Sequence, residues 1–400
     1  MPKAVVILPT STYRAADFLK AAESLGIDLV VASEQPPPFD MGDRYLQIDC
    51  ADPVAAAETI ASLGEKVPID GVVAADDQGV MVAAHASSIL GLAGNPAHAA
   101  AATRDKLLMR SRLAAAEIDQ PAFAGIGPQD SPVEVAAAVG FPLVIKPTDR
   151  SASQGVIRVD RIEDVEPVVE RIRKIVGGDA TLMAEGYVPG IEIAIEGLVT
   201  DGELTVLAVF DKPDTSSGPY FPETLFITPS RLPDASIAEA ERVAATSIRA
   251  LGLTSGPVHI ELRVERDRAR IIEVAARSVG GLCSRSLSFG LMGTTLESLI
   301  LRNAIGQPGK PLHREPVARG VLMIPTPRSG TLKRVDGEDE TRQIEDITGI
   351  DYTITPGSRI VAPPEGDRYL GFVYARAATP ELVESALRKA MATLEVQLEG

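Results

Sequence analysis

The alternation of apolar and polar residues is most regular between Gly256 and Gly281, in the stretch GPVHIELRVERDRARIIEVAARSVGG. It continues on both sides of a polar turn at 266–268, with the period of a β-strand whose two faces differ. The sequence therefore predicts an antiparallel hairpin. The apolar face is expected to carry Val258, Ile260, Leu262, Val264, Ile272, Val274 and Ala276, and the polar face His259, Glu261, Arg263, Ile271, Glu273, Ala275 and Arg277.

Two glutamates on the polar face are expected to lie opposite each other. If the turn centres on Asp267, Glu261 and Glu273 are paired across the two strands. Like charges in this position repel, so a compensating charge is expected. Mg²⁺ commonly binds one or two carboxylates together with phosphate oxygens. The alternative is an exposed hairpin whose glutamates face water.

Residues 1–95 alternate between apolar runs and segments with helical spacing, which predicts a Rossmann-like parallel sheet with helices on its faces. No G-x-G-x-x-G follows the first strand, so a dinucleotide fingerprint is missing. Asp76 and Asp77 follow the fourth strand, where such sheets bind ligands, and either contact substrate or cap the next helix. The expected strands are 4–8, 27–32, 45–48 and 69–75, and the expected helices 14–25 and 54–63.

In the next region, Lys146 and the loop after it suggest phosphate binding, whereas Lys106 taken alone indicates only a solvated charge. Lys106 lies in the first turn of a helix predicted to run to about residue 116, with Thr103 as its N-cap and Asp105 in its first turn. Lys146 ends an apolar strand, and the loop Ser151–Gly155 follows it. Small residues let backbone N–H groups approach phosphate oxygens, and a lysine adds charge. An ordinary flexible connection is the alternative.

Further strands and helices are predicted towards the C-terminus. The polar, Pro-rich stretch 211–230 is long enough to be a binding loop, and composition marks a boundary near 310. Strands are expected at 121–126, 141–146, 181–188, 191–200, 203–211, 319–324, 331–335, 360–361 and 369–377, and helices at 133–139, 162–176, 235–251, 294–305 and 380–398.

Composition excludes several classes of protein. The 400 residues are 45% hydrophobic and 24% charged, as in a soluble protein, and the net charge of −16 argues against a nucleic-acid-binding surface. Cys50 and Cys283 give no disulfide framework. No apolar run approaches the length of a membrane span. We therefore expect no membrane association and a cytoplasmic location.

In this order and spacing the motifs resemble the ATP-grasp family, from residue 1 to about residue 310. The resemblance implies α/β and α+β architecture: a Rossmann-like pre-ATP-grasp domain at 1–95, a two-lobed ATP-grasp domain at 96–310 with its small lobe at about 110–188, and a C-terminal α+β subdomain at 311–400. It implies ATP with Mg²⁺ or Mn²⁺ as cofactors. It also implies a homodimer.

The resemblance assigns roles to individual residues. Glu261 and Glu273 match the metal carboxylates, and Arg277, Lys146 and Ser153 match residues at the transferred phosphate. Glu192 matches the ribose contact, and Val188 the backbone that recognises adenine. The implied nucleotide-binding residues are Lys106, Lys146, Ser151, Ser153, Gly155, Val156, Glu185, Tyr187, Val188 and Glu192.

One departure narrows the assignment. Many members read E-x-N-x-R, with the asparagine completing metal coordination, whereas residues 273–277 read E-V-A-A-R, so that Ala275 offers no ligand. An E-x-A-A-R version is typical of the branch resembling bacterial L-amino-acid ligases, as are His259-x-Glu261 and the loop Gly218–Thr224. The coordination of a second metal stays open.

The implied reaction is ATP-dependent ligation of a carboxylate to an amine through an acyl phosphate, with amino acids as substrates. Asp211 or Glu223 would hold a substrate ammonium, and Arg277 and Arg285 carboxylate or acyl-phosphate groups. His259 either orients a metal carboxylate, contacts substrate or is a buried strand histidine. The alternatives are a purine-pathway or carboxylase-type ATP-grasp enzyme, or a nucleotide-binding regulator without catalysis. The identity of the acid and the amine is not encoded in any motif.

Overall fold

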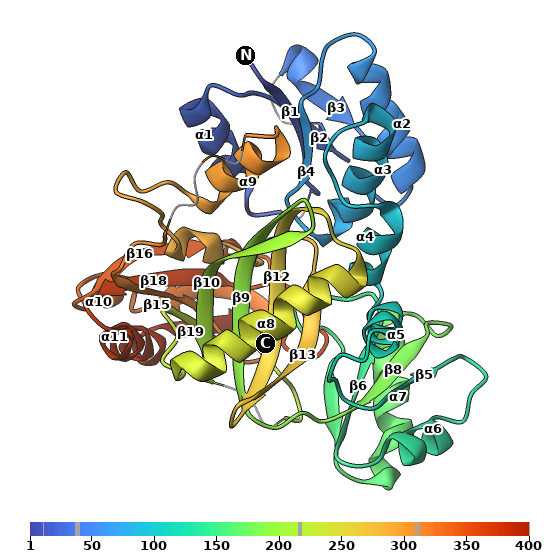
Figure 1. Cartoon of the computed structure of the whole chain (residues 1–400). Coiled ribbons are helices and arrows are strands. Elements are labelled where there is room, and N and C mark those ends of the chain that lie inside the picture. Colours follow the sequence, from blue (N-terminus) through green and yellow to red (C-terminus); the bar gives the residue numbers. More distant parts are fainter. Residues whose placement is uncertain (11, 37–40, 215–217, 308, 310–312, 400) are drawn as a thin grey trace.

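The computed structural model describes residues 1–10, 12–36, 41–214, 218–307, 309 and 313–399 (Figure 1). The expected loop 211–230 and the boundary near 310 therefore lie partly outside the described residues. Figure 1 shows the N-terminal part at the top, a small lobe at the lower right, and a large sheet that continues into the C-terminal elements at the left. Within the described ranges, none of the helices is both long enough and apolar enough to cross a bilayer.

The N-terminal domain is the predicted parallel sheet with helices on both faces. Its strands lie in the order β3-β2-β1-β4. Val5 and Ile7 of the first strand pack with the helices at 53–64 and 80–90, whereas Ala4 and Val6 pack with those at 15–25 and 296–304. The elements are β1 (Lys3–Ile7), α1 (Ala15–Leu25), β2 (Asp28–Ser33), β3 (Tyr45–Gln47), α2 (Pro53–Gly64), β4 (Gly71–Ala74), α3 (Val80–Leu90) and α4 (Ala97–Arg104).

The small lobe is an antiparallel sheet in the order β5-β8-β6-β7. Its core includes Leu143, Ile145, Val169 and Ile172, which join the sheet to one of its helices. The elements are α5 (Lys106–Ala115), β5 (Phe123–Ile126), α6 (Pro132–Val139), β6 (Leu143–Pro147), β7 (Ile157–Val159), α7 (Val165–Val176) and β8 (Leu182–Gly186).

The start of α5 differs from the sequence-based expectation. Asp105, not Thr103, is the N-cap, and its carboxylate accepts hydrogen bonds from the backbone of Leu107 and Leu108 at 2.8 and 3.1 Å. A carboxylate that accepts two of the free N–H groups is a strong cap. Thr103 belongs to the preceding helix, where its hydroxyl donates to the carbonyl of Ala100.

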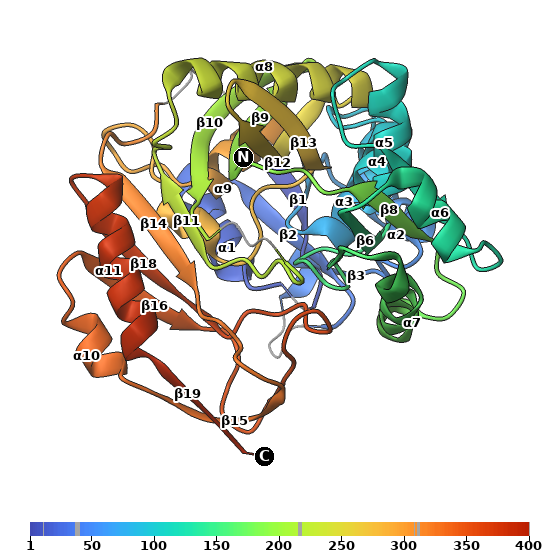
Figure 2. The same ribbon diagram turned by 90° about the horizontal axis from the view of Figure 1, so that it is seen from below.

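The large lobe and the C-terminal region share one eight-stranded sheet, in the order β13-β12-β9-β10-β11-β14-β18-β16. Figure 2 shows α8 lying along one side of this sheet and α11 beside its C-terminal strands. The elements are β9 (Ile191–Thr200), β10 (Glu203–Lys212), β11 (Leu225–Thr228), α8 (Asp234–Leu251), β12 (Ser255–Glu265), β13 (Arg268–Ala275), α9 (Leu296–Ala304), β14 (Ala318–Met323), β16 (Ile347–Tyr352), β18 (Gly371–Ala377) and α11 (Pro380–Thr393).

A separate three-stranded sheet, β17-β15-β19, completes the C-terminal region. The expected terminal helix 380–398 is too long: α11 ends at Thr393, and the residues after it form a strand that pairs with β15. The elements are β15 (Gly330–Asp336), α10 (Glu338–Arg342), β17 (Arg359–Ile360) and β19 (Glu395–Glu399).

The β12–β13 hairpin has the expected register at its centre, because Glu261 pairs directly with Glu273. A β-bulge follows, so that Leu262 pairs with Ile271 and Ile272 is the extra residue. A bulge reverses which side chains face the core beyond it. Ile271 is therefore fully buried in the core, and Ile272 faces a cavity, the opposite of the expected assignment.

Candidate active site

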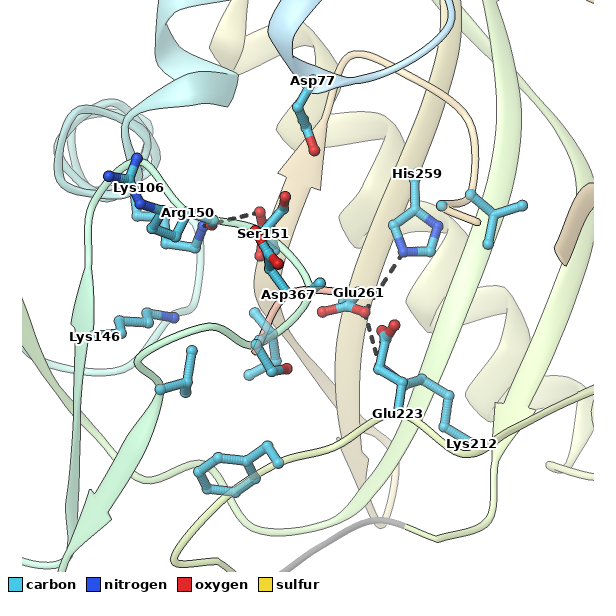
Figure 3. Close-up of a pocket in the computed structure, with 18 of the residues that line it drawn as sticks. Asp77, Lys106, Lys146, Arg150, Ser151, Lys212, Glu223, His259, Glu261 and Asp367 are labelled. Atoms are coloured by element: carbon cyan, nitrogen blue, oxygen red, sulfur yellow. Dashed lines mark hydrogen bonds and ion pairs between the residues drawn. The ribbon is translucent and has the colours of Figure 1, made fainter. Parts of the chain in front are cut away.

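The predicted site residues gather around one cavity of about 380 Å³ (Figure 3). The N-terminal domain, the small lobe, the central sheet and a segment of the C-terminal region all contribute to its lining. The predicted residues that line it are Lys106, Lys146, Ser151, Ser153, Val156, Glu185, Tyr187, Val188, Glu192, Glu223, His259, Glu261, Glu273 and Arg277.

Lys146 lies at the end of β6 in a buried ionic cluster. Its ammonium pairs with Glu185 of β8, and the other oxygen of that carboxylate accepts from Arg110 of α5 at 2.9 Å. Burial lowers the pKa of Lys146, with Glu185 opposing this effect. Burial also raises the pKa of Glu185, but Arg110 and Lys146 outweigh it and the net shift is downward. The cluster holds a cation at the cavity wall in a fixed position.

Arg110 also connects the small lobe to the hairpin. Its guanidinium donates to the carbonyls of Ile271 and Ile272 at 2.8 and 2.9 Å, beside the bulge. Because the side chain is fully buried, these bonds have no competition from water. They fix the position of β13 relative to α5.

Lys106 is the second cation at this end of the cavity. Its ammonium donates to the carbonyl of Arg150 at 2.6 Å and to Glu273 at 3.1 Å. Its position at the start of α5, which Asp105 caps, directs the side chain between the Ser/Gly loop and the hairpin. One of the two predicted metal carboxylates is therefore neutralised by a lysine in this structure.

The loop Ser151–Gly155 has an unusual backbone conformation. Ala152 and Ser153 have φ values of 52° and 55°, in the left-handed region that costs free energy for residues other than glycine. A β-carbon at Gly155 would lie 2.9 Å from the ring of Pro147, so glycine is required for this close approach. Ser151, Ala152 and Ser153 line the cavity, as expected of a loop that contacts phosphate groups.

Arg263 organises the opposite end of the cavity. Its guanidinium donates to the hydroxyl of Tyr187 and the carbonyl of Val188, both at 2.9 Å, and pairs with Glu192 at 2.9 Å. The ring of Phe221 stacks on Tyr187, with centroids 6.5 Å apart. Flat aromatic surface, backbone groups and a fixed carboxylate are suited to binding a base and its ribose.

Lys212 pairs with three glutamates of the cavity, two of which, Glu223 and Glu261, are labelled near it in Figure 3. Its ammonium is 2.5 Å from Glu192, 2.8 Å from Glu261 and 3.2 Å from Glu223. Burial disfavours the charge on Lys212, but the three glutamates raise its pKa well above the usual value. Burial likewise raises the pKa of Glu261, while Lys212 and His259 bring it well below the usual range.

The donor set fits a hard divalent cation. Glu261 and Glu273 face each other across the hairpin, and both are carboxylates, the ligands that Mg²⁺ prefers. Lys212 pairs with Glu261 and Lys106 with Glu273, so that a lysine compensates the charge of each carboxylate. In the parts of the chain that the structure describes, no group of three or more His, Cys, Asp or Glu side chains has a metal-binding arrangement.

His259 is a buried histidine held between two carboxylates. Nδ1 pairs with Glu196, and Nε2 lies 3.5 Å from Glu261. The second oxygen of Glu196 accepts from the backbone of Val279 at 2.9 Å. Burial disfavours the imidazolium, but Glu196 outweighs it and raises the pKa of His259 to about 9. With this pKa, His259 is a cation near neutral pH, and its Nε2 faces Glu261.

Arg277 is positioned by the N-terminal domain. Its Nε donates to Asp77 at 2.8 Å, and Asp77 also pairs with Arg104 at 3.2 Å. Burial raises the pKa of Asp77, but Arg277 and Arg104 lower it to about 2 overall. Asp77 was expected either to contact substrate or to cap a helix; it makes no side-chain cap, lines the cavity and fixes the orientation of the arginine.

Three predicted residues are not brought to the cavity lining. Asp211 precedes Lys212 in β10, and successive side chains of a strand point to opposite faces, so that Asp211 pairs with Arg231 at 2.8 Å. Arg285 pairs with Asp17 and Asp351 at 3.0 and 2.7 Å. Gly155 contributes its backbone conformation and lies beside the lining.

The residues that the sequence-based prediction missed include Lys212, Arg263 and Tyr369, which line the cavity, and Arg110, which holds Glu185. Arg263 could have been found, because the alternation places it on the polar face with Glu261. Lys212 could also have been found, because it follows Asp211 in the strand and must therefore point to the opposite face. Arg110 and Tyr369 carry no local signal, since only the tertiary structure brings Arg110 to Glu185 and Tyr369 to the cavity.

Three domain models match the chain in order. They are the ATP-grasp N-terminal domain over residues 19–94, the ATP-grasp domain over 139–286, and the L-amino acid ligase C-terminal domain 2 over 322–399. The protein is thus an ATP-grasp protein in which each of the three expected regions contains a match.

A solved relative extends the similarity over the whole chain. The L-amino acid ligase from Bacillus licheniformis is 25% identical, with a TM-score of 0.81, and the match covers 100% of this chain and 99% of that one. An L-arginine-specific L-amino acid ligase of Bacillus subtilis is 20% identical over 84% of this chain and 82% of its own length.

An alanine–anticapsin ligase of Bacillus subtilis is 28% identical over 56% of this chain, and the match spans about half (51%) of that relative's length. The domain matches and the ligases among the relatives define the class: an ATP-dependent ligase that forms C–N bonds. Within this class, the chain is similar to the L-amino acid ligases.

Proposed function

We propose that the protein joins the carboxylate of one amino acid to the amine of another through an acyl phosphate, releasing ADP and phosphate. The observation that carries the proposal is the single cavity that collects two lysines, the Glu261–Glu273 pair and Arg277. Phosphoryl transfer to a carboxylate requires positioning and charge neutralisation more than covalent chemistry. These residues supply both.

Several residues of the cavity have a defined part in the proposed reaction. Lys146 and Lys106 neutralise phosphate oxygens, and Arg277 stabilises the carboxylate and its phosphorylated form. A divalent cation held by Glu261 and Glu273 would neutralise further phosphate charge. Glu192 binds the ribose, and Arg263 fixes the position of the Glu192 carboxylate. Tyr187 and Val188 contact the base. Ser151 and Ser153 close over the phosphates and exclude water, which would otherwise hydrolyse the acyl phosphate.

Glu223 is the proposed ligand of the substrate ammonium. It lines the cavity beside Lys212 and His259, on the side away from Lys146 (Figure 3). The names of the similar ligases support amino-acid substrates. A homodimer, and the choice between Mg²⁺ and Mn²⁺, remain predictions from the resemblance.

The test is phosphate release from ATP and Mg²⁺ with pairs of L-amino acids, with products identified by mass spectrometry. We expect release that depends on an amino acid and a condensation product in equal amount. Glu273→Gln should lower the rate at least a hundredfold, since it removes a metal carboxylate. Glu265→Gln changes an exposed glutamate of the same hairpin and should leave the rate unchanged. ATP binding without amino-acid-dependent release in any pair would refute amino-acid ligation.

A further inference from the structure

A short segment of the C-terminal region, residues 362–369, reaches the cavity although it lies outside the ATP-grasp lobes in sequence. We call it the strap. Asp367, Arg368 and Tyr369 line the cavity, although they are about 90 residues beyond the hairpin in sequence. At its first end, the backbone of Ala362 donates to Ser329 at 3.0 Å. At its last end, the carbonyl of Tyr369 accepts from the hydroxyl of Thr353.

One end of the strap holds the phosphate-binding loop. The backbone N–H of Gly155 donates to the carbonyl of Pro364 at 2.8 Å. The side chain of Gln154 donates to the carbonyl of Glu365 at 2.9 Å, and the carboxylate of Glu365 pairs with Arg171 of α7 at 2.7 Å. The small lobe is therefore attached to the C-terminal region at the loop that closes over the phosphates.

The other end holds the proposed substrate carboxylate. The hydroxyl of Tyr369 donates to one oxygen of Glu223, and Lys212 lies 3.2 Å from the other. The ring of Tyr369 packs edge-on against Phe372, which also contacts Tyr13 of the N-terminal domain. Two fixed donors determine the orientation of the Glu223 carboxylate, and one of them belongs to the strap.

The strap has little freedom to take another path. The N–H of Gly366 donates to the carbonyl of Ala362 at 3.0 Å. A β-carbon at Gly366 would lie 2.0 Å from the carbonyl oxygen of Val361, and that atom belongs to backbone that cannot move aside cheaply. Any larger residue at 366 must open this turn, between the two attached ends.

We propose that the strap is a positioning element that links the two halves of the reaction. Pro364 and Glu365 hold the phosphate loop closed, and Tyr369 positions Glu223 for the substrate ammonium. One rigid segment thus sets the geometry of phosphate transfer and of amine binding together. The part that concerns Glu223 rests on the proposed function; the hold on the phosphate loop does not.

Hydrogen exchange tests the hold on the phosphate loop in the full-length protein without substrates. Gly366→Ala should speed exchange of the Gly155 amide at least tenfold, because it displaces the acceptor Pro364. Gly178→Ala is the matched control, since Gly178 lies in the small lobe with open space around it, and should change that exchange less than twofold. Unchanged exchange in a folded Gly366→Ala protein overturns this half of the proposal.

Tyr369→Phe tests the positioning of Glu223 by removal of one hydroxyl. The substrate is the L-amino acid that gives the greatest phosphate release. We expect Tyr369→Phe to raise the KM for this amino acid about tenfold, while the Kd of ATP·Mg²⁺, measured by calorimetry, stays within twofold. Tyr352→Phe, on β16 and outside the cavity lining, should change neither. Equal effects of Tyr369→Phe on both constants, or none on KM, reject the positioning role. If no amino acid stimulates release, the proposed function fails, and the exchange result still decides the attachment of the loop.

Discussion

At the scale of single residues, the site depends on pairs of charged side chains: Glu261 faces Glu273 across the hairpin, and Asp77 holds Arg277. Alternation correctly placed Glu261 and Glu273 on the same face, since a two-residue period fixes the face of every side chain. Their direct pairing also depends on the bulge between Glu261 and Leu262. The same rule, applied at the end of β10, would have favoured Lys212 over Asp211 for the cavity. No local rule could have paired Arg277 with Asp77, because these residues are 200 positions apart and meet only when the domains pack.

The Asp77–Arg277 pair predicts a dependence of stability on pH. The pKa of Asp77 is lowered from 3.8 to about 2 in the folded protein, so the pair stabilises fully above the unfolded pKa and loses its contribution as pH falls through about 2. Asp77→Asn should therefore reduce the free energy of unfolding by about 2 kcal/mol at pH 7 and by about half as much at pH 3. Urea unfolding at several pH values measures this difference.

The control for this prediction is Asp179→Asn, which changes an exposed aspartate of the small lobe. It should alter stability by less than about 0.5 kcal/mol at every pH. A difference between wild type and Asp77→Asn that stays constant from pH 7 to pH 3 would contradict the assigned pKa shift.

At the scale of elements, most helices and strands were predictable because their apolar residues follow one period. The Rossmann-like strands, the β12–β13 hairpin and α8 agree with the expected ranges to within a few residues. The bulge at Ile272 was not predictable, because Ile271 and Ile272 are equally apolar and only the register with β12 distinguishes them. Strand β19 was missed for a similar reason, since its pairing with β15 depends on tertiary structure.

The bulge predicts different effects for the same substitution at two adjacent isoleucines. Ile271→Ala should lower the free energy of unfolding by roughly 2–5 kcal/mol, because Ile271 is fully buried in the core. Ile272→Ala should cost about 1 kcal/mol or less and weaken ATP·Mg²⁺ binding several-fold, because Ile272 lines the cavity. Denaturant unfolding and calorimetric titration of both variants measure the two effects. Similar losses of stability in both would show that the bulge is misplaced.

On the scale of the whole molecule, the site depends on contacts among regions that are distant in sequence. The C-terminal strands β14, β18 and β16 extend the sheet that carries Lys212 and Glu261, although composition suggested a boundary near 310. The N-terminal domain is joined to the rest by Arg14, which precedes α1 and is almost completely buried. Its guanidinium pairs with Glu297 of α9 at 2.6 Å and donates to Ser278, next to Arg277.

Arg14 therefore provides a test of how firmly the N-terminal domain is attached. Arg14→Met should lower the free energy of unfolding by roughly 3–5 kcal/mol, because it leaves the buried Glu297 carboxylate without its partner. Adding Glu297→Met should restore most of this loss, since burying apolar side chains of similar volume carries no such cost. The surface pair Arg242 and Glu239 is the matched control, and its removal should leave the free energy of unfolding nearly unchanged. A double-mutant cycle with no coupling between Arg14 and Glu297 would mean that apolar packing of α1 against α9, and not this ion pair, holds the domain beside the active site.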